Sequence, residues 1–155
     1  MTDHVAYIRQ CYALADEAVA HGNHPFGALL VLDGRVVATA CNDAVISGNP
    51  TRHAEMMLLA ESLASVPLQA RSRAVLYTST EPCVMCAGAI YWSGISTVVF
   101  GCSAAALATV AGGEFLVPCR ETFARGKRAI AVTGPVLESE GLARHRTFWR
   151  RDGSA

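Results

Sequence analysis

The alternation of short apolar runs with segments of helical periodicity is the feature that most constrains how this chain folds. We expect strands at 28–32, 35–40, 74–78, 97–100 and 129–132. Helices are predicted at 5–19, 53–64, 82–93, 118–125 and 137–149, whereas the small residues of 103–113 fit either a helix or a loop. Strands that alternate with helices in this way predict an α/β protein in which helices cover both faces of a sheet.

The first two strand segments also carry a turn signal. Asp33-Gly34 separates them and predicts a tight hairpin. The segment 28–32 is apolar at every position, which is typical of a strand that is covered on both faces. The sequence therefore predicts an antiparallel pair whose first strand is fully buried.

Composition limits the class of protein. The chain has 155 residues, of which 52% are hydrophobic and 17% charged, and its formal net charge is zero. These values exclude a disordered chain and argue against a generally basic nucleic-acid binder. The length fits one domain, residues 1–155, and the low charged fraction suggests that a partner subunit covers some of the surface.

One long uncharged stretch, from Pro82 to Gly113, raises the question of a membrane span. Polar residues are scattered through it, Ser93-Gly94 divides it and no Lys/Arg cluster flanks it, so we interpret it as buried core. The amino terminus lacks the pattern of a secretory signal. We therefore expect a cytoplasmic protein with reduced cysteines and no membrane association.

The residues with the clearest chemical signature are His53, Glu55, Cys83 and Cys86. Two cysteines three residues apart in the first turn of a helix face the same side, and a histidine from a second helix start completes three zinc ligands. Three protein ligands leave the fourth tetrahedral position open for water, as in catalytic zinc sites. Glu55 stands two residues from the histidine, within reach of that water.

Two other interpretations of these residues stay open from spacing alone. Cys83 and Cys86 could form a redox pair. A closed structural zinc site would need a fourth ligand, and Cys102, Cys41 and His24 are available, although none has a ligand-like spacing to the pair. His-x-Glu followed by Pro-Cys-x-x-Cys is the signature of zinc-dependent deaminases, which favours the catalytic site.

The motifs around these residues resemble those of the cytidine deaminase superfamily, in the branch of guanine deaminases, fungal-type cytosine deaminases and bacterial tRNA adenosine deaminases. The matching segments lie before Gly101 and are 25–28, Asn42, 50–55 and 81–92. The resemblance implies a three-layer α/β/α sandwich with a five-stranded mixed sheet, one zinc ion per chain and a homodimer. Most relatives in this branch carry alanine where Arg52 stands.

The reaction that the resemblance implies is hydrolytic deamination. Zinc held by His53, Cys83 and Cys86 activates a water, and Glu55 carries protons to the ring nitrogen beside the amino-bearing carbon and then to the departing amine. The expected substrate is therefore a ring whose amino group sits on an amidine-like carbon.

The resemblance favours a free aminated purine-like base, guanine or a close analogue, as the substrate. Phe26 and Trp92 would hold the flat ring between them, and Asn42 and the backbone near Ala54 would meet its polar edge. Glu114 would accept hydrogen bonds from the N–H groups of the base.

The last predicted helix supplies two further expected contacts, Phe148 and Trp149. These aromatic side chains would close over the cavity and exclude water, in their own or in a neighbouring subunit. A closed cavity leaves little room for a ribose-phosphate chain. Nucleic acid is therefore the less favoured partner, though it is not excluded.

Three alternatives to deamination of a free purine base remain. A tRNA-specific adenosine deaminase has nearly identical motifs, but the segment 103–107 differs from that family and the net charge is zero. A pyrimidine such as cytosine or isocytosine would use the same chemistry in a smaller pocket. A structural module stapled by zinc is the alternative outside enzymes.

Overall fold

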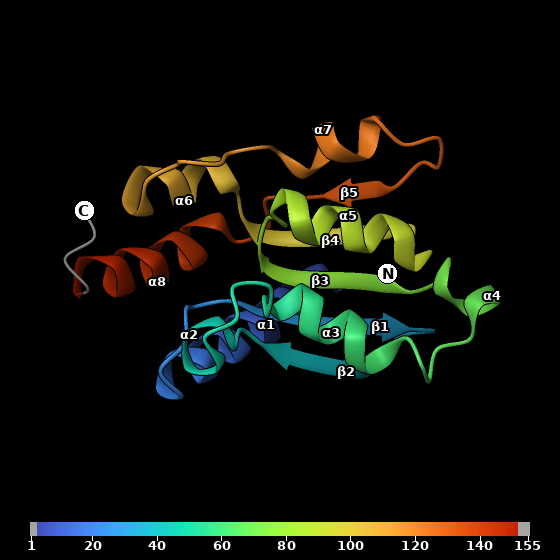
Figure 1. Cartoon of the computed structure of the whole chain (residues 1–155), viewed down its shortest axis with the longest axis horizontal. Helices are drawn as coiled ribbons and strands as arrows, with labels where there is room; N and C mark the ends of the chain where they lie inside the picture. The colour runs from blue at the N-terminus through green and yellow to red at the C-terminus, as the bar shows by residue number, and fades with distance from the viewer. Residues whose placement is uncertain (1–2, 152–155) are drawn as a thin grey trace.

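One five-stranded mixed sheet organises the computed structural model, which describes residues 3–151 (Figure 1). The strands are β1 (Gly27–Leu32), β2 (Arg35–Cys41), β3 (Val75–Thr80), β4 (Thr97–Cys102) and β5 (Ala131–Thr133), in the spatial order β2-β1-β3-β4-β5. β1 runs antiparallel to β2 and β3, and β4 runs parallel to β3 and β5. The predicted α/β class and five-stranded mixed sheet are confirmed.

The hairpin between β1 and β2 turns at Asp33-Gly34, as predicted. Both residues have positive φ, 49° and 77°, as a type I′ turn requires. Aspartate and glycine tolerate this conformation better than most residues do, so the dipeptide fixes where the chain reverses.

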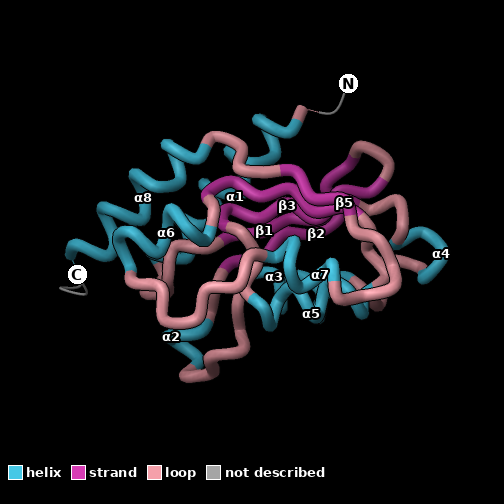
Figure 2. The backbone as a smooth tube through the Cα atoms, turned by 90° about the horizontal axis from the view of Figure 1, so that it is seen from above, coloured by secondary structure: helices cyan, strands magenta, loops and turns pink. Residues whose placement is uncertain are grey.

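Helices cover both faces of the sheet. They are α1 (His4–Ala20), α2 (Ala44–Ser47), α3 (Ala54–Ser62), α4 (Leu68–Arg71), α5 (Val84–Ser93), α6 (Ala104–Ala111), α7 (Cys119–Ala124) and α8 (Glu138–Arg151). Figure 2 shows the sheet between a layer that contains α1 and α8 and a layer that contains α3, α5 and α7. The three-layer α/β/α sandwich is therefore confirmed.

Side chains that alternate along the central strands fill the two interfaces. Leu30 and Leu76 belong to the core under α3, α5 and α7. Leu29 and Tyr77, their neighbours in sequence, pack with Ile8 and other residues of α1 on the opposite face. Both faces of β1 are thus buried, which explains why this strand is apolar at nearly every position.

Some segments add to the sequence-based expectation. The ambiguous segment 103–113 forms α6 and then a loop, and Ser103 caps the helix by accepting a hydrogen bond from the Ala106 N–H at 3.1 Å. The one-turn helices α2 and α4 are not predicted, because four residues carry no helical periodicity. Within residues 3–151, no helix combines the length and the hydropathy that a bilayer crossing requires.

The carboxyl ends of the parallel strands β3 and β4 meet at one edge of the sheet, where α/β proteins commonly place their ligands. Glu81, directly after β3, fixes the loops at this edge. Its Oε2 accepts a hydrogen bond from the Ala104 N–H at 3.0 Å, and its Oε1 accepts one from the Cys119 N–H at 2.9 Å. One buried carboxylate thus connects the end of β3 with the starts of α6 and α7.

Candidate active site

Three side chains that could hold a metal ion converge at the starts of α3 and α5. His53 immediately precedes α3, Cys83 immediately precedes α5, and Cys86 lies in the first turn of α5. The Sγ atoms of both cysteines lie 3.6 Å from His53 Nδ1. Tetrahedral zinc with ordinary Zn–S and Zn–N bonds separates a sulfur and a nitrogen ligand by about 3.6 Å, so the donor set and its spacing fit zinc.

No fourth protein ligand joins this cluster in the described part of the chain. Among residues 3–151, the only group of three or more histidine, cysteine and acidic side chains close enough to share an ion is His53, Cys83 and Cys86. Cys102, Cys41 and His24, which a closed structural site would need, lie outside the group. The geometry therefore favours the open, catalytic type of site over a structural one.

The titration of the two thiols is coupled. The hydrogen bond with Cys86 lowers the pKa of the Cys83 thiol to about 4, whereas that bond and burial raise the pKa of Cys86. The hydrogen bond with Cys83 raises the pKa of His53. A low-pKa thiolate beside a second thiol and an imidazole can bind a divalent cation with release of the remaining proton.

Glu55 lies beside the cluster, in the first turn of α3, with only 6% of its surface exposed. Its Oε1 accepts a hydrogen bond of 2.8 Å from Thr78 Oγ1, and its Oε2 lies 3.5 Å from Cys86 Sγ. Burial raises the pKa of this carboxyl above its usual value. A raised pKa suits a group that takes up and releases a proton near neutral pH.

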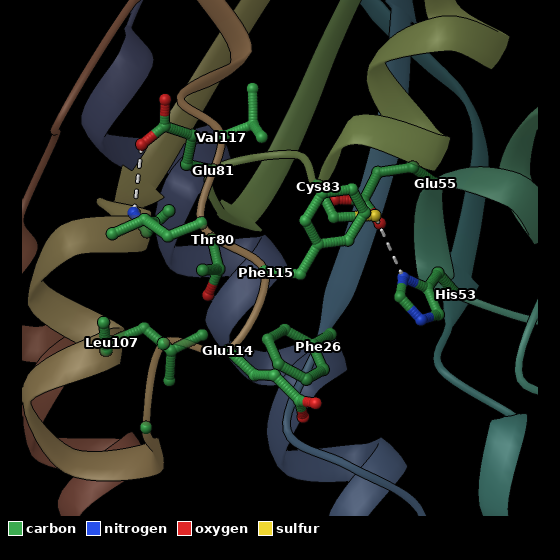
Figure 3. A pocket seen from close by; sticks show the side chains of 15 residues that line it. Phe26, His53, Glu55, Thr80, Glu81, Cys83, Leu107, Glu114, Phe115 and Val117 are labelled. Atoms are coloured by element: carbon green, nitrogen blue, oxygen red, sulfur yellow. Dashed lines mark hydrogen bonds between the residues drawn. The ribbon is translucent and has the colours of Figure 1, made fainter.

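A cavity of about 230 Å³ opens onto these residues (Figure 3). It is smaller than the roughly 300–1,000 Å³ of pockets for drug-sized ligands, and it suits one small ring system. The carboxyl end of β3 and the start of α5 border the cavity on one side. Helix α6 and the loop 112–117 border it on the other side. Its lining consists of Phe26, His53, Glu55, Thr80, Glu81, Cys83, Ala104, Leu107, Ala108, Gly112, Gly113, Glu114, Phe115, Leu116 and Val117.

Four of the residues expected to contact a base lie at or near this cavity. Phe26 and Glu114 line it, the latter from the exposed loop 112–117. Ala54 is fully buried between His53 and Glu55. Asn42 is 2% exposed, its N–H donates to the Phe26 carbonyl at 3.0 Å, and its Oδ1 accepts from the Ala44 N–H at 3.1 Å.

Trp92 does not lie at the cavity of its own chain, contrary to expectation. Its side chain is 85% exposed, and its ring meets the edge of Tyr91 at 5.5 Å between centroids. Six residues of helix separate it from Cys86, which turns it about 240° around α5 from that ligand. The cysteine motif therefore faces the cavity while Trp92 faces away.

Phe148 and Trp149 also do not line the cavity of their own chain, so the expected closure by the last helix is not observed there. α8 packs against α6 and β4, and the rings of both residues lie against His24, at 5.9 Å and 5.2 Å. Phe148 instead lines a separate groove between α1 and α8. The loop 112–117 occupies the rim where that closure was expected.

Sequence analysis misses several residues that shape the site, among them Thr78, Thr80, Glu81 and His145. Thr78 and Thr80 do carry a signal, because residues two apart at the end of a strand face the same side. Glu81 could be noticed as an acid within an uncharged, buried region. A single histidine in a charged helix such as α8 gives no comparable signal.

Comparisons with known proteins agree with this geometry. Residues 1–102 match the family model described as the cytidine and deoxycytidylate deaminase zinc-binding region. The chain therefore belongs to the cytidine and deoxycytidylate deaminase family. The expectation of a zinc-type hydrolytic nucleobase deaminase is thereby confirmed at the level of the class.

Relatives within the family have different substrates in their names. The chain is 35% identical over 150 residues to a probable cytosine deaminase of Schizosaccharomyces pombe, covering 94% of this chain and 91% of the relative. It is 32% identical over 154 residues to a tRNA-specific adenosine deaminase of Buchnera aphidicola, covering 97% and 91%. Identity to a Bacillus subtilis guanine deaminase is 36% over 99 residues, 63% of this chain and 64% of the relative.

Two similar solved structures are those of a guanine deaminase and of a complex with a purine. A guanine deaminase from Nitrosomonas europaea has a TM-score of 0.83 at 25% identity, covering 97% of this chain and 86% of that one. A protein crystallised with 2,6-diaminopurine has a TM-score of 0.84 at 26% identity, covering 100% and 86%. Family and fold are thus shared with deaminases of several bases.

Proposed function

We propose that this chain, as a single deaminase domain, hydrolytically deaminates a free nucleobase, guanine or a close purine-like analogue, and releases ammonia. The observation that carries the proposal is the small cavity, lined by Phe26 and Glu114, that opens directly onto His53, Cys83 and Glu55. An aromatic wall suits a flat ring, and an exposed carboxylate at the rim accepts from N–H donors, which guanine presents.

The metal site and Glu55 divide the chemistry between them. One zinc ion per chain, held by His53, Cys83 and Cys86, would supply an acidified water at the cavity floor. Glu55 would take the proton of that water on Oε2, because Thr78 occupies Oε1 and Oε2 faces the cysteine cluster. The carboxyl would then give this proton to the ring nitrogen beside the amino-bearing carbon. Once the water oxygen has added to that carbon, the carboxylate would take up the second proton of the former water and pass it to the amine, which leaves as ammonia.

Cytosine is a second candidate substrate with specific support. The probable cytosine deaminase of S. pombe matches nearly the whole chain, whereas the B. subtilis guanine deaminase matches 63% of it. The structures that resemble the chain over 97–100% of its length include a guanine deaminase and a complex with 2,6-diaminopurine, which favours the purine. The relative named for tRNA is also matched over 97% of this chain, so RNA belongs in the test.

The deciding experiment measures ammonia release by zinc-loaded protein from guanine, 2,6-diaminopurine, cytosine, isocytosine, free nucleosides and an anticodon stem-loop. Guanine or its analogue is expected to give the highest kcat/KM. The variant Glu55→Gln, which cannot move the proton, is the control and should lose about 10²–10⁴ in turnover while it keeps its metal. Efficient turnover of the stem-loop or of cytosine, without turnover of guanine, would reject the purine assignment and leave the deaminase chemistry intact.

The proposal includes a homodimer. Trp92, on the apolar helix α5, is 85% exposed. Tryptophan is enriched at protein–protein interfaces, so such an exposed ring favours a partner surface there. A second copy of the chain over α5 would bury it. Light scattering at micromolar concentration should give about twice the 16.4 kDa of one chain, and a monomeric mass would refute the dimer.

A further inference from the structure

A chain of hydrogen bonds runs from the last helix to the cavity. Trp149 Nε1 lies 3.3 Å from His145 Nδ1, and His145 Nε2 lies 2.9 Å from Thr80 Oγ1. His145 is 2% exposed and Thr80 is 3% exposed, so water does not compete freely for either group. The ring of His145 also lies 5.4 Å from that of Phe26, and both Phe26 and Thr80 line the cavity.

The direction of these hydrogen bonds follows from the donors present. The indole N–H of Trp149 can only donate, so His145 Nδ1 must accept and carries no proton. Burial lowers the pKa of His145 to about 4, which keeps the ring neutral at physiological pH. A neutral imidazole has one N–H, and here it lies on Nε2. His145 therefore donates to Thr80 Oγ1.

The Thr80 hydroxyl consequently still has its own proton to donate. Two residues earlier, Thr78 uses its hydroxyl on Glu55 Oε1 and on the Thr80 carbonyl. Thr80 differs, because among residues 3–151 the one hydrogen-bond partner of its Oγ1 is His145. His145 donates to a lone pair of this oxygen and leaves the hydroxyl proton unused. A threonine at the cavity wall with a filled acceptor position and a free O–H offers a hydrogen-bond donor to whatever the cavity binds.

We infer that the Thr80 hydroxyl is a specificity-determining donor to a lone pair on the substrate base, a ring nitrogen or carbonyl oxygen, and that His145 and Trp149 are positioning residues that orient it. This inference rests on the proposed function, since it assigns the donor to a nucleobase. Glu114 accepts and Thr80 donates, and both line the cavity (Figure 3), so the cavity selects a base that offers both an N–H and an acceptor. A site with such paired groups discriminates against bases that lack either partner.

The test compares Thr80→Val, which keeps the shape and removes the hydroxyl, with Thr80→Ser, which keeps the hydroxyl. On the preferred base, Thr80→Val should lower kcat/KM about tenfold, and Thr80→Ser should stay within about threefold of wild type. The same variants are then assayed on analogues in which each acceptor atom is removed in turn: deaza analogues for the ring nitrogens and a deoxo analogue for the carbonyl. For the analogue that lacks the atom bound by Thr80, wild type itself should show the roughly tenfold lower kcat/KM. On that analogue, Thr80→Val should turn over as well as wild type does.

A merely structural role gives a different pattern. If Thr80→Val costs the same factor on every analogue, or costs nothing on the preferred base, the donor assignment is overturned. The measurements are made on whichever substrate wild-type protein turns over, so failure of the purine assignment appears in wild type alone and not in the ratio between variants. If wild type turns over no base or stem-loop, both the proposed function and the donor role are rejected.

The positioning role has its own comparison. His145→Gln keeps an N–H near the place of Nε2, and His145→Leu removes it. His145→Leu should reproduce the substrate-analogue profile of Thr80→Val, and His145→Gln should restore the wild-type profile in large part. The double variant His145→Leu, Thr80→Val should be no worse than the worse single variant, because both remove the same interaction. Additive losses, or no rescue by glutamine in folded, zinc-loaded protein, would overturn the positioning role.

Discussion

Thr78 Oγ1 donates a hydrogen bond of 2.8 Å to Glu55 Oε1, and both residues are buried. The bond joins the end of a central strand to the first turn of α3. It holds one carboxylate oxygen still and leaves Oε2 directed toward Cys86. Orientation of this kind matters because proton transfer requires hydrogen-bond contact in a defined geometry.

Loss of this contact should therefore reduce turnover more than binding. Thr78→Val keeps the size of the side chain and removes its hydroxyl, so we expect kcat to fall about tenfold while KM changes little. Thr78→Ser, which retains the hydroxyl, is the matched control. Equal kinetics for the valine and serine variants would show that Glu55 needs no help from this strand.

Metal content should depend on the three clustered side chains. Cys83→Ser removes one thiolate, so we expect its zinc content after dialysis to fall well below one ion per chain. Cys41→Ser is the matched control, because Cys41 lies outside the cluster and hydrogen-bonds to the Leu14 carbonyl, which serine can also do. Full zinc occupancy in Cys83→Ser protein would move the metal site elsewhere.

The carboxylate at the rim should contribute to selection of the base. Glu114→Gln replaces an acceptor-only group with an amide, so kcat/KM for guanine should fall at least about tenfold, the loss of one charge-assisted hydrogen bond. Glu121→Gln changes an exposed acid on α7 that does not line the cavity, and it should leave guanine turnover unchanged. A loss in both variants would indicate a general charge effect instead of a contact.

The buried His145 should make stability depend on pH. The pKa of His145 is lowered to about 4 in the folded protein, whereas an unfolded chain has an ordinary histidine with a pKa near 6.5. Below about pH 6.5 the unfolded state binds the extra proton, so stability is lost as the pH falls toward 4. Between pH 7.5 and pH 5 this loss is about 2 kcal/mol.

Urea unfolding of zinc-loaded wild type and His145→Gln measures that effect. Both proteins keep the same metal ligands, so acid-induced loss of zinc affects them alike. We expect wild type to lose about 2 kcal/mol more of its free energy of unfolding than His145→Gln does from pH 7.5 to pH 5. Parallel curves over this range would show that His145 keeps an ordinary pKa.

The candidate site residues that the structure brings together, as the sequence suggests, are those encoded over short distances. His53 and Glu55 are two residues apart, and Cys83 and Cys86 are three apart, so a helix start alone sets their directions. The strands are equally local, because each is a short apolar run with a turn at its end.

The residues that do not take their expected places have two different causes: the local rotation of α5 for Trp92, and long-range packing for the residues of α8. Trp92 lies only six residues beyond Cys86, yet the helix rotation takes it away from the cavity. Phe148 and Trp149 are placed by the way α8 docks on β4 and α6, which no motif in α8 encodes. His145 reaches Thr80 across 65 residues of sequence, so only the assembled fold reveals their contact.

The buried carboxylate of Glu81 separates changes in the rim loop from changes at the candidate metal and proton-transfer residues, whether evolution or a protein engineer makes them. Its two oxygens hold the chain at Ala104 and at Cys119, which lie on either side of the rim loop 112–117. With both anchors fixed, insertions or replacements in the loop need not propagate to His53, Cys83 or Glu55. Changes in loop 112–117 can thus alter which ring fits the cavity, while the positions of His53, Cys83 and Glu55 stay the same.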